Sequence, residues 1–197
     1  MPIPPQIPLF ILLSSLTVAP WAAAQDSLAK IERVGTLRDP RLFEASGIAV
    51  SRAHPGVLWT HNDSGDSATV YAITLAGNLL ATYRVPGAIA VDWEDIALGP
   101  CPDQAGRCLY IADTGDNGER RRAPTIYVVP EPDPPQRPIR DTLRTGRAHG
   151  LRVRYPDGPH DVEAIAVNPQ GDAFLGAQPQ VSEHAQTLVD QLQHPFL

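Results

Sequence analysis

Acidic side chains recur at a fixed distance before three short apolar segments of this sequence. In each segment one acid stands four residues before the isoleucine of an Ile-Ala-aliphatic run: Glu44, Asp92 and Asp161. A second acid follows two residues later in two of the segments, as Glu94 and Glu163. Carboxylate oxygens are the preferred ligands of hard cations such as Ca²⁺, which takes six to eight of them. The pattern therefore predicts a calcium site, although acids before a strand also cap turns and keep sheet edges soluble.

A second shared element is an acidic turn of the form Asp-Ser/Thr-Gly-Asp, at 63–66 and 113–116. Its glycine suits a turn with positive φ, so the aspartates could serve as Asx-turn residues. The other interpretation is that the turns offer further metal ligands: Asp63, Asp113, Asp116 and the adjacent Asn117. Neither turn has the ligand spacing of an EF-hand loop, so any site here differs from that motif.

Catalytic candidates are few in this sequence. His61 lies beside the first acidic turn, and with Glu94 it could activate a metal-bound water as a general base. The alternative for a lone histidine is an ordinary turn residue. There is no Gly-x-Ser-x-Gly elbow, so a serine hydrolase is not expected.

The repeat predicts an all-β fold made of four-stranded units. The isoleucines of the three segments are 48 and 69 residues apart, and the first unit continues through a hairpin with a Gly77-Asn78 turn. Four short strands repeating at about 50 residues are typical of a β-propeller blade, whose first strand lines a central channel. We expect blades at 40–87, 88–157 and 158–178. A Pro-rich connector at 130–138 explains the longer second spacing.

The third unit is incomplete. No acidic turn follows it, and the divergent tail at 179–197 has apolar residues at the spacing of a short C-terminal helix. About two and a half blades are predicted, which cannot close a ring and leave open sheet edges for self-association. Truncation or a frame shift after about residue 175, giving a non-functional product, is one interpretation, and assembly between chains is another.

The N-terminal residues 1–24 are predicted to be a signal peptide. An apolar run at 9–19 is too short to span a bilayer comfortably, and Ala22-Ala23-Ala24 forms a small-residue cleavage pattern. Residues 25–197 would then form the exported domain, periplasmic or extracellular, without a stable membrane span. In that setting Cys101 and Cys108 predict a disulfide rather than a zinc pair.

Composition and charge set limits on partners. Hydrophobic residues make up 43% and charged residues 19% of the 197 residues, as in globular proteins. The 21 prolines and 15 glycines favour turns over long helices. A formal net charge of −6 is poorly suited to binding phosphate backbones, so nucleic acid is not an expected partner.

The stretch from Ser46 to Pro132 resembles a family of secreted bacterial β-propeller proteins of largely uncharacterised function. Three motifs carry the resemblance: Trp-Thr-His-Asn-Asp-Ser-Gly-Asp at 59–66, Val-Asp-Trp-Glu-Asp-Ile-Ala at 91–97 and Asp-Thr-Gly-Asp-Asn at 113–117. The stretch is also broadly similar to six-bladed, calcium-containing propellers of the TolB-like and phytase-like kinds. This resemblance implies a metal in the channel, and it implies no reaction.

Two functional hypotheses follow for a folded protein. The first is an exported, calcium-binding scaffold or ligand-binding module, whose small-molecule or protein ligand the sequence does not identify. The second is a metal-dependent hydrolase, phosphoesterase-like or lactonase-like, that uses channel carboxylates.

Overall fold

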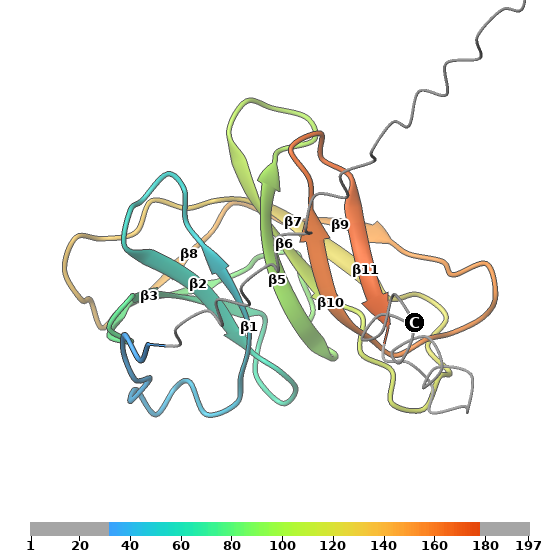
Figure 1. Ribbon diagram of the computed structural model, residues 1–197, viewed down its shortest axis with the longest axis horizontal. Coiled ribbons are helices and arrows are strands. Elements are labelled where there is room, and N and C mark those ends of the chain that lie inside the picture. The colour runs from blue at the N-terminus through green and yellow to red at the C-terminus, as the bar shows by residue number, and fades with distance from the viewer. Residues whose placement is uncertain (1–31, 178–197) are drawn as a thin grey trace, which may run out of the picture. The chain divides into compact units, whose positions relative to one another are not determined.

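The computed structural model describes residues 32–177, and every regular element in that range is a β-strand (Figure 1). The strands are β1 (Ala45–Val50), β2 (Val57–Asn62), β3 (Thr69–Thr74), β4 (Leu79–Arg84), β5 (Trp93–Pro100), β6 (Arg107–Asp113), β7 (Thr125–Pro130), β8 (Thr142–Arg144), β9 (His149–Arg152), β10 (Val162–Val167) and β11 (Ala173–Ala177). The predicted signal peptide at 1–24 and the predicted helix in the tail at 179–197 lie outside the described residues.

The strands form three separate sheets. The first sheet has the order β1-β2-β3-β4-β8, the second β5-β6-β7-β9, and the third contains β10 and β11. All neighbouring strands are antiparallel except β4 and β8, which are parallel. The sheets do not join into a closed structure. This arrangement confirms the predicted all-β, blade-like and incomplete fold.

Local sequence explains the hairpins that build the first sheet. The middle strands β2, β3 and β4 are buried on both faces and consist mainly of β-branched, aromatic and other apolar residues. The turn from β3 to β4 contains Gly77 at a φ of 84°. That conformation is easily reached by glycine, so the predicted Gly77-Asn78 turn is confirmed.

The connector after β7 contributes a strand to the first sheet. The Ile139 amide donates to the Leu80 carbonyl over 2.9 Å, and β8 then pairs with β4 before the chain returns to the second sheet as β9. The Pro-rich segment 130–138 was expected to connect two strands of one unit, and the strand after it was not predicted. Because β8 has three residues and no buried side chain, its sequence carries no strand periodicity.

Aromatic side chains fill the space between the first and second sheets. Trp59 and Trp93 are 0% and 1% exposed, and they belong to one apolar cluster. Trp59 meets Tyr83 edge to face at 5.5 Å between ring centroids, and Trp93 packs against Tyr127 at 6.4 Å. A second cluster, which includes Tyr110, lies between the second and third sheets.

One carboxylate fastens the connector to this core. The indole Nε1 of Trp59 donates to Oε1 of Glu131 over 2.9 Å, and the Ser51 hydroxyl donates to the same oxygen over 2.5 Å. The buried indole N–H thereby gains an acceptor that the apolar core lacks. Glu131 follows β7 directly, so the bond ties the second sheet to the first.

The loop between β5 and β6 is closed by the predicted disulfide. Cys101 and Cys108 are bonded, with their Cα atoms 5.0 Å apart. A small closed loop of this kind restricts the unfolded chain and contributes roughly 2–3 kcal/mol. Among residues 32–177 no helix is long and apolar enough to cross a membrane.

Candidate functional site

The first strands of the three sheets, β1, β5 and β10, lie side by side and run in the same direction. The Ser46 hydroxyl on β1 donates to the Glu94 carbonyl on β5 over 2.6 Å. The Ile165 amide on β10 donates to the Asp95 carboxylate on β5 over 2.9 Å. Because these contacts join equivalent places in the repeated segments, the acids before each strand are brought to one end of the three strands.

Each of these strands has an irregularity at this level. The pairing shifts between Ala45 and Ile48 in β1, and β5 and β10 have similar shifts around Glu94 and Glu163. In β5 and β10 the extra residue is therefore a glutamate. A β-bulge redirects the side chain of its extra residue, which explains how both glutamates reach the space between sheets.

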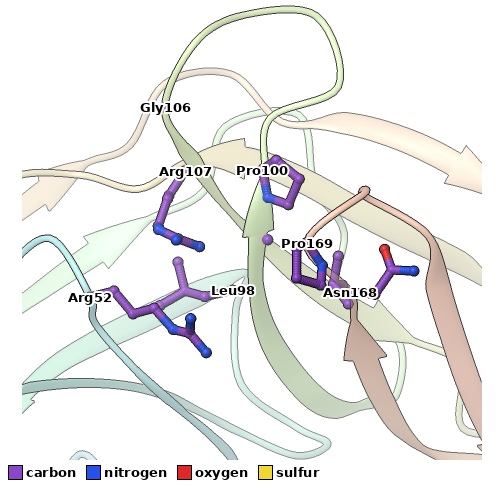
Figure 2. A pocket seen from close by; sticks show the side chains of 9 residues that line it. Arg52, Leu98, Pro100, Gly106, Arg107, Asn168 and Pro169 are labelled. Carbon is purple, nitrogen blue, oxygen red and sulfur yellow. The ribbon is translucent and has the colours of Figure 1, made fainter.

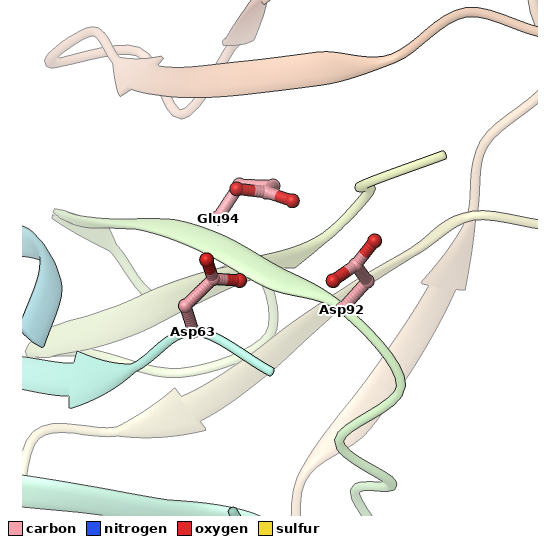
Figure 3. A group of neighbouring side chains, drawn as sticks. All are labelled: Asp63, Asp92 and Glu94. Atoms are coloured by element: carbon pink, nitrogen blue, oxygen red, sulfur yellow. The ribbon is translucent and has the colours of Figure 1, made fainter. Parts of the chain in front are cut away.

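Five carboxylates gather there in two overlapping triads. The first triad is Asp63, Asp92 and Glu94, and the second is Glu94, Asp161 and Glu163. In each triad one oxygen from every residue lies within 4.8 Å of the others. Figure 3 shows the three carboxylates of the first triad around a common space. We call these five residues the acidic cluster. All three sheets contribute to it, since Asp63 follows β2 directly.

The walls of the acidic cluster fit an oxygen-ligated ion. Oδ1 of Asp63 is buried and has no hydrogen-bond partner among the described residues. The backbone of Gly115 lies so close that an added Cβ would contact Oε1 of Glu94 and approach Oδ2 of Asp92 to 2.5 Å. Glycine at 115 therefore leaves room for the carboxylates of Glu94 and Asp92. The sequence had indicated only a turn role for this glycine.

Two other predicted ligands support the cluster from outside. Asp113 is 1% exposed, accepts the Asp92 amide over 2.9 Å and forms an ion pair with Arg121 at 2.7 Å. Asp116 accepts the Arg121 amide, and its own amide donates to the Asp161 carboxylate over 2.7 Å. The structure places neither in the two triads. Arg121 was not predicted, because an arginine in the run 120–122 looks like a solvated charge.

Glu44 and Asn117 are not in the acidic cluster. Both side chains are exposed. The Glu44 carbonyl accepts the Asp63 amide over 3.0 Å, so the Glu44 backbone helps to position the cluster although its carboxylate does not join either triad.

His61 is completely buried, with an exposure of 0%. Its ring packs edge to face against Trp93 at 5.7 Å, and its Nδ1 lies 2.9 Å from the Asn62 carbonyl. Burial lowers the pKa of His61, and the nearby charges of Asp95 and Asp63 oppose this in part. Nothing in this position of His61 supports its predicted role in activating water. That role, and the hydrolase that would use it, stay predictions.

Electrostatic repulsion and burial shape the protonation of the acidic cluster. Glu94 is 7% exposed, and burial raises its pKa to about 8, with further contributions from a hydrogen bond to Glu163 and from the charge of Asp63. Burial and the charges of Asp63 and Asp161 also raise the pKa of Asp92, while Arg121 lowers it. The cation-free cluster therefore holds a proton at neutral pH.

This proton predicts how stability depends on pH. The pKa of Glu94 is about 8 in the folded protein and 4.5 in an ordinary environment, so the folded state holds a proton that the unfolded chain has released. The contribution of the Glu94 proton to stability should be fully present below pH 4.5 and be lost as pH rises through 8. We expect the Tm in EDTA to fall over this range, and the Glu94→Gln variant to show a much flatter profile by scanning fluorimetry. Equal slopes for both proteins would contradict the assignment.

The acidic cluster has a defined chemical character. Its donors are all carboxylate oxygens, and the charge of Arg121 acts on one of them, Asp92. Such a set can hold a hard cation or share protons. Comparison of the chain with protein-family models, with curated proteins and with solved structures finds no match.

Proposed function

We propose that this chain is an exported β-propeller fragment that acts as a calcium-stabilised scaffold, with Ca²⁺ bound by the acidic cluster. The observation that carries the proposal is the pair of carboxylate triads that share Glu94. The buried, unpartnered oxygen of Asp63 and the close approach of Gly115 support it.

The donor set favours calcium over other common metals. Neither triad contains a sulfur or nitrogen ligand, whereas zinc sites are built mainly from cysteine and histidine. Mg²⁺ demands a nearly ideal octahedron and keeps several waters, while Ca²⁺ accepts irregular, carboxylate-rich sites. Because Glu94 belongs to both triads, it would bridge two ions if each triad holds one.

Calcium would act as a cross-link between the sheets. Asp63 comes from the first sheet, Asp92 and Glu94 from the second, and Asp161 and Glu163 from the third. Without a cation these carboxylates repel one another, and their repulsion opposes the packing of β1, β5 and β10. Binding of an ion to the folded state alone stabilises that state by mass action.

Export is consistent with the same chemistry. The Cys101–Cys108 disulfide persists in oxidising compartments such as the periplasm or the extracellular space. A calcium site of modest affinity is also used by extracellular modules, where Kd values reach about 10⁻⁴–10⁻³ M. The apolar segment at 9–19 would direct this export.

The proposal is tested by titrating Ca²⁺ into the EDTA-stripped, full 197-residue chain by calorimetry, with the Tm followed in parallel. We expect saturable binding and a higher Tm. The Glu94→Gln variant should bind at least about a hundredfold more weakly, because buried charged ligands contribute several kcal/mol. Asp141→Asn removes one exposed acid before β8 and serves as the matched control. Neither heat nor a Tm change in the wild type would refute the proposal.

A further inference from the structure

A cavity of about 360 Å³ lies at the opposite end of the strands β1, β5 and β10 from the acidic cluster. It is lined by Arg52, Leu98, Gly99, Pro100, Gly106, Arg107, Val167, Asn168 and Pro169. Most of these residues end or follow the three strands, and Gly106 and Arg107 lie at the start of β6, whereas the acidic cluster lies where β5 and β10 begin. The volume is at the lower end of the range for small-molecule sites, roughly 300–1,000 Å³.

Two arginines from different sheets face this cavity. Arg52 follows β1 and Arg107 begins β6, and Figure 2 shows their side chains on the same side of β5, with Leu98 between them. Neither guanidinium forms an ion pair or donates a hydrogen bond within residues 32–177. No acidic residue lines the cavity. Two unpaired guanidinium groups at one cavity attract an anion, and arginine is suited to bidentate contacts with carboxylates.

The loop that carries Arg107 is held in place. The Cys101–Cys108 disulfide closes it, and the Cys101 amide donates to the Gly106 carbonyl over 3.1 Å. Cys108, next to Arg107, is 2% exposed. The arginine therefore projects from a fixed backbone, which reduces the entropy lost on binding a ligand.

A second cavity, with the apolar side chains of Ile48 and Val50 in its wall, adjoins the arginine pair. Its volume is about 270 Å³, and it shares Arg52 and Leu98 with the first cavity. The rest of its lining is Ile48, Ala49, Val50, Asp95, Ile96, Ala97 and Ile165. Ile48 and Val50 are 58% and 62% exposed, so apolar surface remains in contact with solvent beside the guanidinium groups. Burying that surface against a ligand would be favourable.

We propose that the two cavities together bind an amphipathic organic acid, with its carboxylate at Arg52 and Arg107 and its apolar tail along β1 and β5. The guanidinium pair supplies the charge, and Val50 and Ala97 supply the surface for the tail. The site is independent of the cation proposed above, because it shares no residue with the acidic cluster.

Octanoate is the probe for the first experiment. It is titrated into the full chain in EDTA, which excludes calcium soaps and effects of the acidic cluster. We expect saturable binding by calorimetry, with the amide NMR signals of Gly99 and Gly106 shifting along the same isotherm. Octanol has a similar tail without the charge, and inorganic phosphate has charge without the tail. Both should bind at least tenfold more weakly than octanoate.

Arginine variants locate the carboxylate. Arg52→Gln and Arg107→Gln should each weaken octanoate binding at least tenfold. Arg84→Gln, an exposed arginine at the end of β4, should change it less than twofold. Both cavity arginines are exposed, so we expect unchanged Tm values for all three variants. Equal losses for the three would show general charge attraction and overturn the proposed site.

A tail variant tests the apolar part separately. Val50→Ser should weaken octanoate binding several-fold and butanoate binding much less, because the shorter acid has less apolar surface to bury against β1. Absence of octanoate binding, or equal binding of octanoate and octanol, would refute the proposal whatever the result of the calcium titration.

Discussion

Replacement of Gly115 by alanine should remove most of the calcium affinity proposed for the acidic cluster while the protein stays folded. The added methyl would occupy the position of the Glu94 carboxylate and lie 2.5 Å from Oδ2 of Asp92. Both atoms are at the ends of side chains, which can rotate away at a small cost to the fold. Their displacement would open both triads, since Glu94 belongs to each. We expect a loss of at least about a hundredfold in affinity, as for removal of a buried charged ligand.

Gly118→Ala is the control for this substitution. Gly118 lies on the same loop, and a Cβ added there would have no neighbour closer than 3.8 Å. Calorimetric titration with Ca²⁺ compares the two variants, and circular dichroism checks that both are folded. Wild-type affinity in Gly115→Ala would show that the carboxylates near Gly115 do not hold the ion.

Replacement of Gly47 by alanine should destabilise the protein by about 3 kcal/mol or more, the range of severe overpacking in a rigid core. Gly47 on β1 lies against β5, and an added Cβ would come within 2.6 Å of both Asp95 Cα and Ile96 N. These are backbone atoms, so no side-chain rotation can relieve the clash. The two strands would have to move apart, which weakens the Ser46–Glu94 hydrogen bond and the core around Trp93.

Urea denaturation measures this effect, and Gly146→Ala is the matched control. At Gly146 the nearest atom to an added Cβ is 3.7 Å away, on a proline side chain. We expect the control to be as stable as the wild type. A Gly47→Ala midpoint close to that of the control would mean that β1 and β5 tolerate separation.

The sequence repeat picks out four of the five acids of the acidic cluster, and it also picks out Glu44, whose carboxylate is exposed and belongs to neither triad. Among the described residues β5 packs against a first strand of another sheet on both sides, β1 and β10, whereas β1 packs against only one such strand, β5. Asp92 and Glu94 therefore meet acids from two other sheets, and Glu44 faces solvent. A repeat reveals which positions correspond, and it does not reveal which copy lies in the middle. The fifth acid, Asp63, is indicated by the acidic turn at 63–66, for which the sequence allowed both an Asx-turn role and a metal-ligand role.

Other features had no sequence signal that could have revealed them. Arg52 and Arg107 are 55 residues apart and belong to no shared motif. They meet because β1 ends, and β6 begins, at the same level of two packed sheets. The pairing of β8 with β4 likewise depends on tertiary structure. The three residues of β8 are exposed or half-buried, so their side chains do not favour one sheet edge over another.

The disulfide in the loop after β5 makes the position of Arg107 depend on the redox state of the protein's surroundings. Without the bond between Cys101 and Cys108, the hairpin tip at 102–106 would be less restrained, and the Arg107 side chain at the base of this tip would sample more orientations. The disulfide restricts them. If the chain is exported as proposed, the arginine pair would be ordered only in an oxidising compartment, so the affinity for organic acids would be higher there than in a reducing one.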